Sequence, residues 1–178
     1  MSLLAATGVL AYVAIAAAWD LKSRRIPNWL SGTALVGALV AAVGPDGIGL
    51  AAAAGGALIG LAALLVPFLL GGVGAGDVKF ATVAGTWLGP RLALGALLMG
   101  AALGLFAALG AAAVSGRFAD AVGRAARLVW LLAATLSIVS LPPPTDEEQR
   151  LAAIPYAVPL AAGVMAAVLL DQHGWQLI

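Results

Sequence analysis

The sequence contains no cysteine, and this absence excludes several kinds of chemistry at once. Disulfide bonds, thiolate nucleophiles and cysteine-ligated zinc all require that residue. Charged residues are also scarce: they make up 10% of the chain, whereas a soluble domain carries roughly a quarter. The formal net charge is only +1, so the charge balance does not indicate a nucleic-acid partner and we expect none.

Apolar residues take the place of the missing charges. They account for 63% of the 178 residues, and the mean hydropathy is +1.07. A soluble core cannot absorb such a fraction, so the composition predicts a polytopic membrane protein. The first apolar run, MSLLAATGVLAYVAIAAAWD, looks a little like a signal peptide. However, it has no basic n-region and its charges follow the apolar segment, so we interpret it as a retained first helix.

The apolar runs predict one membrane-embedded domain over residues 1–178, an all-α bundle of about six transmembrane helices of roughly 17–25 residues each. One expected helix is short, because Gly89, Pro90 and Arg91 stop it. The expected spans lie at about 3–19, 28–44, 48–70, 77–89, 92–114 and 152–170.

Residues 115–151 follow a different pattern. Arg117, Asp120 and Arg124 recur at steps of three and four, which places them on one face of a helix. This spacing predicts a basic amphipathic helix in the membrane surface. Its apolar continuation, LVWLLAATLSIVS, is short for a span, so we expect an interfacial or re-entrant segment over about 116–141. A crossing there remains the alternative and would invert the last helix.

Lysine and arginine predict the orientation, because they concentrate on the cytoplasmic side of membrane proteins. Six spans with the N-terminus outside place all but one of the nine basic residues in the cytoplasm. The exception is Arg91, and the others are Lys22, Arg24, Arg25, Lys79, Arg117, Arg124, Arg127 and Arg150. In this topology Asp20 and Asp77 lie at the cytoplasmic ends of two helices, at similar depth.

Asp20 and Asp77 differ from the other acidic residues, which fall in expected loops or on the amphipathic helix. Asp20 follows a long uncharged run, and Asp77 follows Gly74 and Gly76 in GVGAGDVKF. These glycines allow positive φ and carry no Cβ, so an extended backbone could approach the Asp77 carboxyl group. The sequence leaves a simpler alternative open, in which Asp20 is an interfacial anchor and Asp77 caps a helix.

Two carboxyl groups a few ångströms apart share one proton and titrate as a unit. Such a pair can activate a water molecule, because one carboxylate takes the water's proton while the protonated partner polarises a scissile carbonyl group. The sequence offers no competing group for bond cleavage. Its single histidine, His173, lies in the C-terminal tail, on the expected opposite side, so a catalytic zinc site is not expected.

These motifs resemble the type IV prepilin peptidases, which are membrane aspartic proteases with a GxGD signature. GAGD at 74–77 is followed by VKF, and Asp20 is followed by IPN at 26–28. IPYAVPLAAG at 154–163 is similar to the opening of the family's last helix. The structural motif residues that this resemblance identifies are Pro27, Asn28, Pro155 and Pro159.

The resemblance implies that Asp20 and Asp77 are the catalytic pair and that they cleave the leader of a prepilin at the cytoplasmic face of the membrane. Gly74, Gly76 and Lys79 belong to the loop that we expect substrate to approach. Lys79 matches the family's basic position after the aspartate, and the resemblance implies that it helps to hold the loop or the substrate; a solvated interfacial lysine is the alternative. The expected partners are the prepilin, through its leader and the start of its hydrophobic helix, and the lipid bilayer.

Larger members of that family carry paired CxxC elements and also N-methylate the new pilin terminus. Because this chain has no cysteine, it resembles the short, peptidase-only form associated with Flp (tight-adherence) pili. We therefore expect no methylation, no cofactor and no metal. Archaeal preflagellin peptidases are also short, but the composition favours a bacterial inner-membrane protein.

Two other functions are compatible with the composition. A small proton-coupled transporter could use the two aspartates as a relay, although a relay favours acids in mid-membrane and no internal repeat is visible. A non-catalytic scaffold of a pilus or secretion assembly could keep the same fold. The position of both acids at one edge of the expected bundle favours the peptidase.

Overall fold

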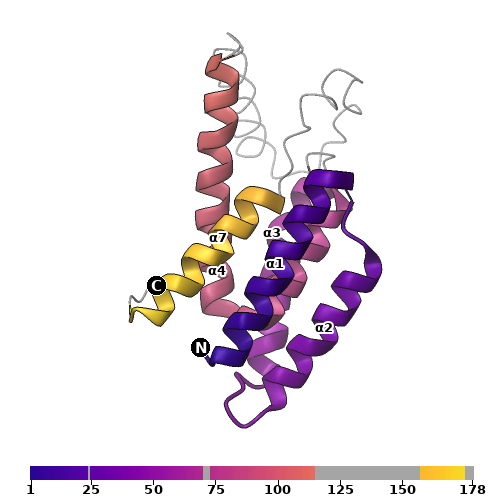
Figure 1. The fold of residues 1–178 in the computed structure, drawn as a ribbon, viewed down its shortest axis with the longest axis vertical. Coiled ribbons are helices and arrows are strands. Elements are labelled where there is room, and N and C mark those ends of the chain that lie inside the picture. The colour runs from indigo at the N-terminus through magenta and orange to yellow at the C-terminus, as the bar shows by residue number, and fades with distance from the viewer. Residues whose placement is uncertain (24, 70–72, 115–156, 175–178) are drawn as a thin grey trace. The chain divides into compact units, whose positions relative to one another are not determined.

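All regular secondary structure in the described part of the computed structural model is helical, which confirms the all-α class (Figure 1). The structure describes residues 1–23, 25–69, 73–114 and 157–174. The helices are α1 (Leu3–Ser23), α2 (Asn28–Val43), α3 (Leu50–Leu69), α4 (Ala75–Val114) and α7 (Ala157–Gln172). The expected interfacial segment at 116–141 and the motif residue Pro155 lie outside the described residues.

The first two helices meet at a proline. We expected the first helix to end at Trp19, and this is wrong: α1 continues to Ser23, so Asp20 lies within it. No helix-breaking residue interrupts this turn, and the Ser23 hydroxyl donates to the Trp19 carbonyl over 2.8 Å. Pro27 has an extended backbone (φ −61°, ψ 140°) and immediately precedes α2. Asn28 is therefore the first helical residue of α2.

The fourth and fifth expected helices are the two parts of α4. The helix is kinked at Gly89, whose φ of 72° and ψ of 174° are not helical. This backbone conformation favours glycine, and Pro90 follows it. The predicted interruption of the helix at Gly89 and Pro90 is therefore confirmed. The first part of α4 begins at Ala75, two residues before the expected start. α2 and α3 also lie within two residues of the expected spans.

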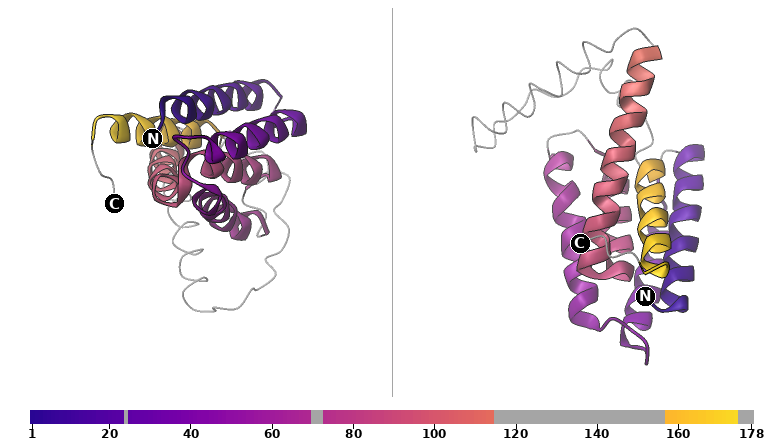
Figure 2. Two further views of the ribbon diagram at one scale, coloured as in Figure 1. Left: turned by 90° about the horizontal axis from the view of Figure 1, so that it is seen from below. Right: turned by 90° about the vertical axis from the view of Figure 1, so that its left-hand side faces the viewer.

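The chain divides into two compact units, residues 1–103 with 155–178, and residues 104–154. Of the second unit the structure describes only 104–114, the end of α4. Within the first unit, α1 packs along both α2 and α7, and α2 packs along α3 (Figure 2). The α1 helix therefore has neighbours on two sides.

Glycines allow the helices of the first unit to approach closely. A Cβ atom on Gly56 would overlap the carbonyl of Gly85, and one on Gly60 would overlap the carbonyl of Ala81. The order of these contacts shows that α3 and the first part of α4 run antiparallel. Small residues permit such backbone contact between helices in membranes. The first part of α4, which carries Asp77, is therefore held directly against α3.

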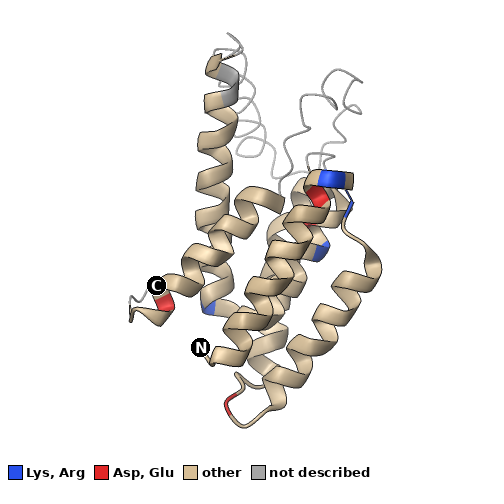
Figure 3. Ribbon diagram, viewed as in Figure 1, with Lys and Arg blue, Asp and Glu red and all other residues tan. Residues whose placement is uncertain are grey.

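Large apolar side chains fill the centre of this unit and also cover its outside. Phe80 is fully buried and its ring stacks on Tyr12 at 5.6 Å between centroids. Many other leucines and valines are exposed, as expected where lipid is the solvent. Figure 3 shows the charged residues of the described chain near helix ends, in a connection between helices and beside the kink of α4, with uncharged helix between them.

Three helices of the described chain are long and apolar enough to cross a membrane: Leu3–Ser23, Leu50–Leu69 and Ala75–Gly110. Asn28–Val43 and Ala157–Gln172 are apolar but shorter. These helices support a membrane protein. They do not confirm six spans, because α4 forms one run that is kinked at Gly89 and the residues between 115 and 156 are not described.

Candidate active site

Asp77 lies in the first turn of α4, where it caps the helix. Its carboxylate oxygen Oδ2 accepts a hydrogen bond from the Gly74 N–H at 3.3 Å, and its own N–H donates to the Gly74 carbonyl at 3.1 Å. A carboxylate that reaches back to the residue before the helix is one half of a capping box. The capping role that the sequence left open is therefore present, and it restricts the orientation of the carboxyl group.

Asp20 approaches Asp77 from the last turn of α1. Each aspartate is only 9% exposed, and they are the buried acidic residues among those that the structure describes. Their carboxyl groups are close enough to interact electrostatically. The structure thus brings together two acids that are 57 positions apart in the sequence. Buried ionisable residues in a membrane domain are expensive and usually have a function.

Lys79 joins the two sequence motifs. Its Nζ donates to the Asn28 side-chain oxygen at 2.8 Å. Next to this bond, Ile26 is 7% exposed and lies against Gly76, where an added Cβ would be 3.7 Å from the Ile26 Cγ1. The connection between α1 and α2 therefore rests on the first turn of α4, and IPN and GAGDVK form one site.

Neither glycine of GAGD uses the positive φ that its residue type allows. Positive φ values occur at Gly49, Gly89 and Gly174 in the described chain, not at Gly74 or Gly76. Gly76 already belongs to α4 and needs no special backbone conformation. Gly74 instead leaves room for the Asp77 carboxylate, because a Cβ at Gly74 would lie 3.3 Å from the Asp77 Oδ2.

Two tryptophans flank this site on the outer surface of α1 and α2. Trp19 and Trp29 are 41% and 58% exposed, and their rings meet edge to face with centroids 5.8 Å apart. Trp19 precedes Asp20, and Trp29 follows Asn28. Sequence analysis missed this pair, because the two residues belong to different helices and only the packing of α1 on α2 brings them together.

Three further residues that the structure describes take part in contacts elsewhere in the bundle. The Pro159 carbonyl lies near Gly100, so this proline packs near the second part of α4. His173 is exposed, and its Nδ1 lies 2.8 Å from the Leu169 carbonyl. Asp171 pairs with the N-terminal amine of Met1 at 3.0 Å, a contact that its sequence position does not indicate.

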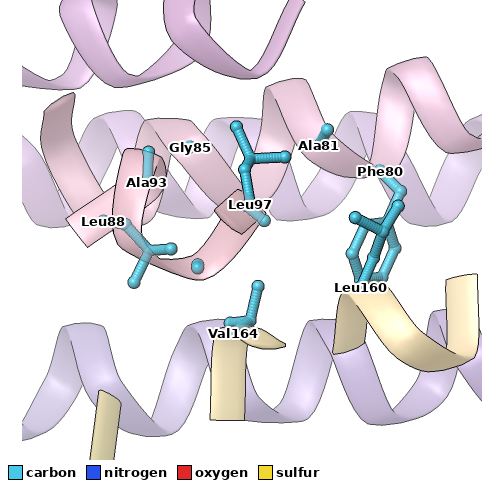
Figure 4. Close-up of a pocket in the computed structure, with 10 residues that line it drawn as sticks. Phe80, Ala81, Gly85, Leu88, Ala93, Leu97, Leu160 and Val164 are labelled. Carbon is cyan, nitrogen blue, oxygen red and sulfur yellow. The ribbon is translucent and has the colours of Figure 1, made fainter. Parts of the chain in front are cut away.

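A small pocket lies elsewhere in the bundle, between the two parts of α4 and α7 (Figure 4). Its volume is about 10 Å³, enough for about one water molecule. Its lining is apolar and includes Phe80, Leu88, Leu97 and Leu160, so it offers neither space nor polar groups for a peptide. Among the residues described, no group of three or more histidine, aspartate or glutamate side chains could hold a metal ion.

The fold and the site define a helical membrane protein with two buried aspartates beside one docked loop. The sequence model of the type IV leader peptidase family matches residues 7–109, more than half of the chain, and the chain belongs to this family. The matched range includes Asp20, Asp77 and Lys79. No curated protein and no solved structure matched the chain. Membership confirms the family inferred from the motifs and makes the chain a peptidase in general terms.

Proposed function

We propose that the chain is an aspartic endopeptidase that removes the leader of a type IV prepilin of the Flp kind, with Asp20 and Asp77 as its catalytic pair. The observation that supports this proposal best is the burial of both carboxyl groups within electrostatic reach of each other, on two separate helices. A cap alone explains Asp77 but does not explain why a second acid is buried beside it.

The proposed reaction needs only the two carboxyl groups and water. One carboxylate takes a proton from the water as its oxygen attacks the scissile carbonyl carbon. The protonated partner donates a hydrogen bond to the carbonyl oxygen and stabilises the charge that develops there. When the carbon–nitrogen bond breaks, the amine leaves with a proton from the pair. No metal and no cofactor takes part.

The proposed location is the cytoplasmic face of a bacterial inner membrane, in one membrane-embedded domain with its N-terminus outside. Lys22, Arg25 and Lys79 lie near the aspartates in sequence, and basic residues favour the cytoplasmic side. A prepilin would present its leader to this face while its hydrophobic helix stays in the bilayer. Without the paired CxxC elements the chain should cleave but not N-methylate its product.

The test is co-expression with a prepilin that carries a short basic leader, with processing measured as a mobility shift on a gel. Asp20→Asn and Asp77→Asn should each reduce processing by about 10²–10⁴-fold, the usual contribution of an acid or base group. Asp46→Asn is the matched control, because Asp46 is an exposed acid in the turn between α2 and α3, and it should process normally.

Each variant must be present in the membrane fraction at the level of the unmodified protein. Normal processing by Asp20→Asn or Asp77→Asn would remove that residue from the catalytic pair. Metal chelators should leave processing unchanged. A loss of processing that added zinc restores would contradict the metal-free mechanism, and proton transport without cleavage would favour a relay instead.

A further inference from the structure

We propose that Lys79 and Asn28 are positioning residues that fix the approach of Asp20 to Asp77. This inference rests on the proposed function of the two aspartates. It assigns no direct chemistry to Lys79 or Asn28. Their role is to hold the connection between α1 and α2 on the first turn of α4.

The geometry of α4 separates Lys79 from the chemistry. Lys79 is two residues after Asp77, and residues two apart on a helix point to different faces. Its ammonium group instead donates to Asn28 at 2.8 Å. Asn28 is the first residue of α2 and has no place in the proposed acid–base steps. A lysine held in this way is oriented toward the loop, not toward a group bound between the carboxyls.

The loop contact continues directly beside the catalytic residue. Ile26 is a buried residue of this connection, and it lies against Gly76, the neighbour of Asp77. Asp20 and Asp77 are on different helices. The described ring contact between these two helices is the Tyr12–Phe80 stack, which lies about two turns before Asp20 and about one turn after Asp77. The Lys79–Asn28 bond and the Ile26–Gly76 contact therefore fix the end of the bundle that holds the acids.

The Lys79–Asn28 bond is exposed, so it should contribute little to overall stability. Its effect should instead fall on geometry, because a displacement of about 1 Å in an active site can reduce a rate about 10²-fold. We expect Lys79→Met and Asn28→Ala each to lower kcat about tenfold with KM nearly unchanged. The double variant should be no slower than the slower single variant, because both remove the same bond.

Two variants make this kinetic test specific. Lys79→Arg keeps a donor and should restore most of kcat. Lys22→Met removes an exposed lysine near the end of α1 and should behave like the unmodified protein. A rise in KM with kcat unchanged would show that Lys79 binds substrate and would overturn the proposal. Full activity of Lys79→Met would overturn it as well.

A second measurement does not depend on activity. Because the chain has no cysteine, Ile26→Cys introduces a single thiol at a buried position of the connection. Its labelling by a maleimide should be slow, and Asn28→Ala or Lys79→Met should accelerate it about tenfold, whereas Lys22→Met should not. Equal labelling in all four proteins would overturn the proposal.

The two proposals fail in distinguishable ways. If Asp20→Asn and Asp77→Asn still process prepilin but labelling at position 26 depends on Asn28 and Lys79, the catalytic assignment is wrong and the loop contact stands. If the aspartate variants are inactive and labelling does not respond, the catalytic pair stands and the positioning role is wrong.

Discussion

The close contact between α3 and α4 leads to a prediction about two glycine-to-alanine substitutions. A Cβ atom on Gly60 would overlap the Ala81 carbonyl and lie 2.6 Å from its carbon and 3.0 Å from the Thr82 nitrogen. Ordinary contacts of this kind are 3.4–4 Å, and both partners are backbone atoms. Gly60→Ala can therefore be accommodated only if α3 and α4 separate by about 1 Å.

Gly32→Ala is the matched comparison, because nothing lies within 4 Å of a Cβ at Gly32. Both glycines are inside helices, so both substitutions gain about 0.5–1 kcal/mol in helix propensity. This gain cancels when the variants are compared. What remains is overpacking at Gly60, typically about 1–3 kcal/mol. Gly60→Ala should be less stable than Gly32→Ala by that amount.

The assay is unfolding of the purified proteins in detergent, with the stability of the two variants compared under the same conditions. Prepilin processing provides a second readout, because the helix that must move carries Asp77. Gly60→Ala should also process more slowly, while Gly32→Ala should not. Equal stability of the two variants would refute the backbone contact between α3 and α4 on which the reasoning depends.

Two further predictions concern Tyr12 and Gly89. Within the described part of the chain, the buried Tyr12 hydroxyl interacts at most weakly with the Ser31 side chain. Tyr12→Phe should therefore change the free energy of unfolding by no more than about 1 kcal/mol. Tyr12→Ala loses the ring stacked on Phe80 and should lose about 3–5 kcal/mol in the same measurement. Gly89→Ala places a side chain at a φ of 72° and a ψ of 174°, a region that is essentially restricted to glycine, and should lower stability by about 1–3 kcal/mol. An unchanged unfolding transition would contradict the kink.

The boundaries that could be predicted from sequence are those marked by residues with restricted backbones. Pro27 and the pair Gly89–Pro90 limit φ, ψ and hydrogen bonding whatever surrounds them, so the start of α2 and the break in α4 follow from local sequence. The end of α1 was predicted wrongly because no residue with a restricted backbone marks it. A charge at Asp20 does not stop a helix, and no residue that does so occurs before the connection to α2.

The site was predictable in part. Asp20 and Asp77 stand out because carboxylates are rare in an apolar chain, and the family match covers both. The hydrogen bond between Lys79 and Asn28 could not be predicted. The two residues are 51 positions apart, and several other exposed basic residues could equally have been expected to bond to Asn28. Contacts such as that of Gly60 with Ala81 depend on the rotation of each helix about its axis, which a run of alanines, glycines and leucines does not define.

The exposed Trp19–Trp29 pair has a consequence for how the enzyme obtains its second reactant. Indole rings favour the boundary between lipid headgroups and hydrocarbon, and these two are adjacent in sequence to Asp20 and Asn28. If Asp20 and Asp77 are the catalytic pair proposed above, that depth borders hydrated headgroups on one side and acyl chains on the other. Hydrolysis there would need no channel through the bundle to deliver water, and a substrate helix could reach the acids without leaving the lipid.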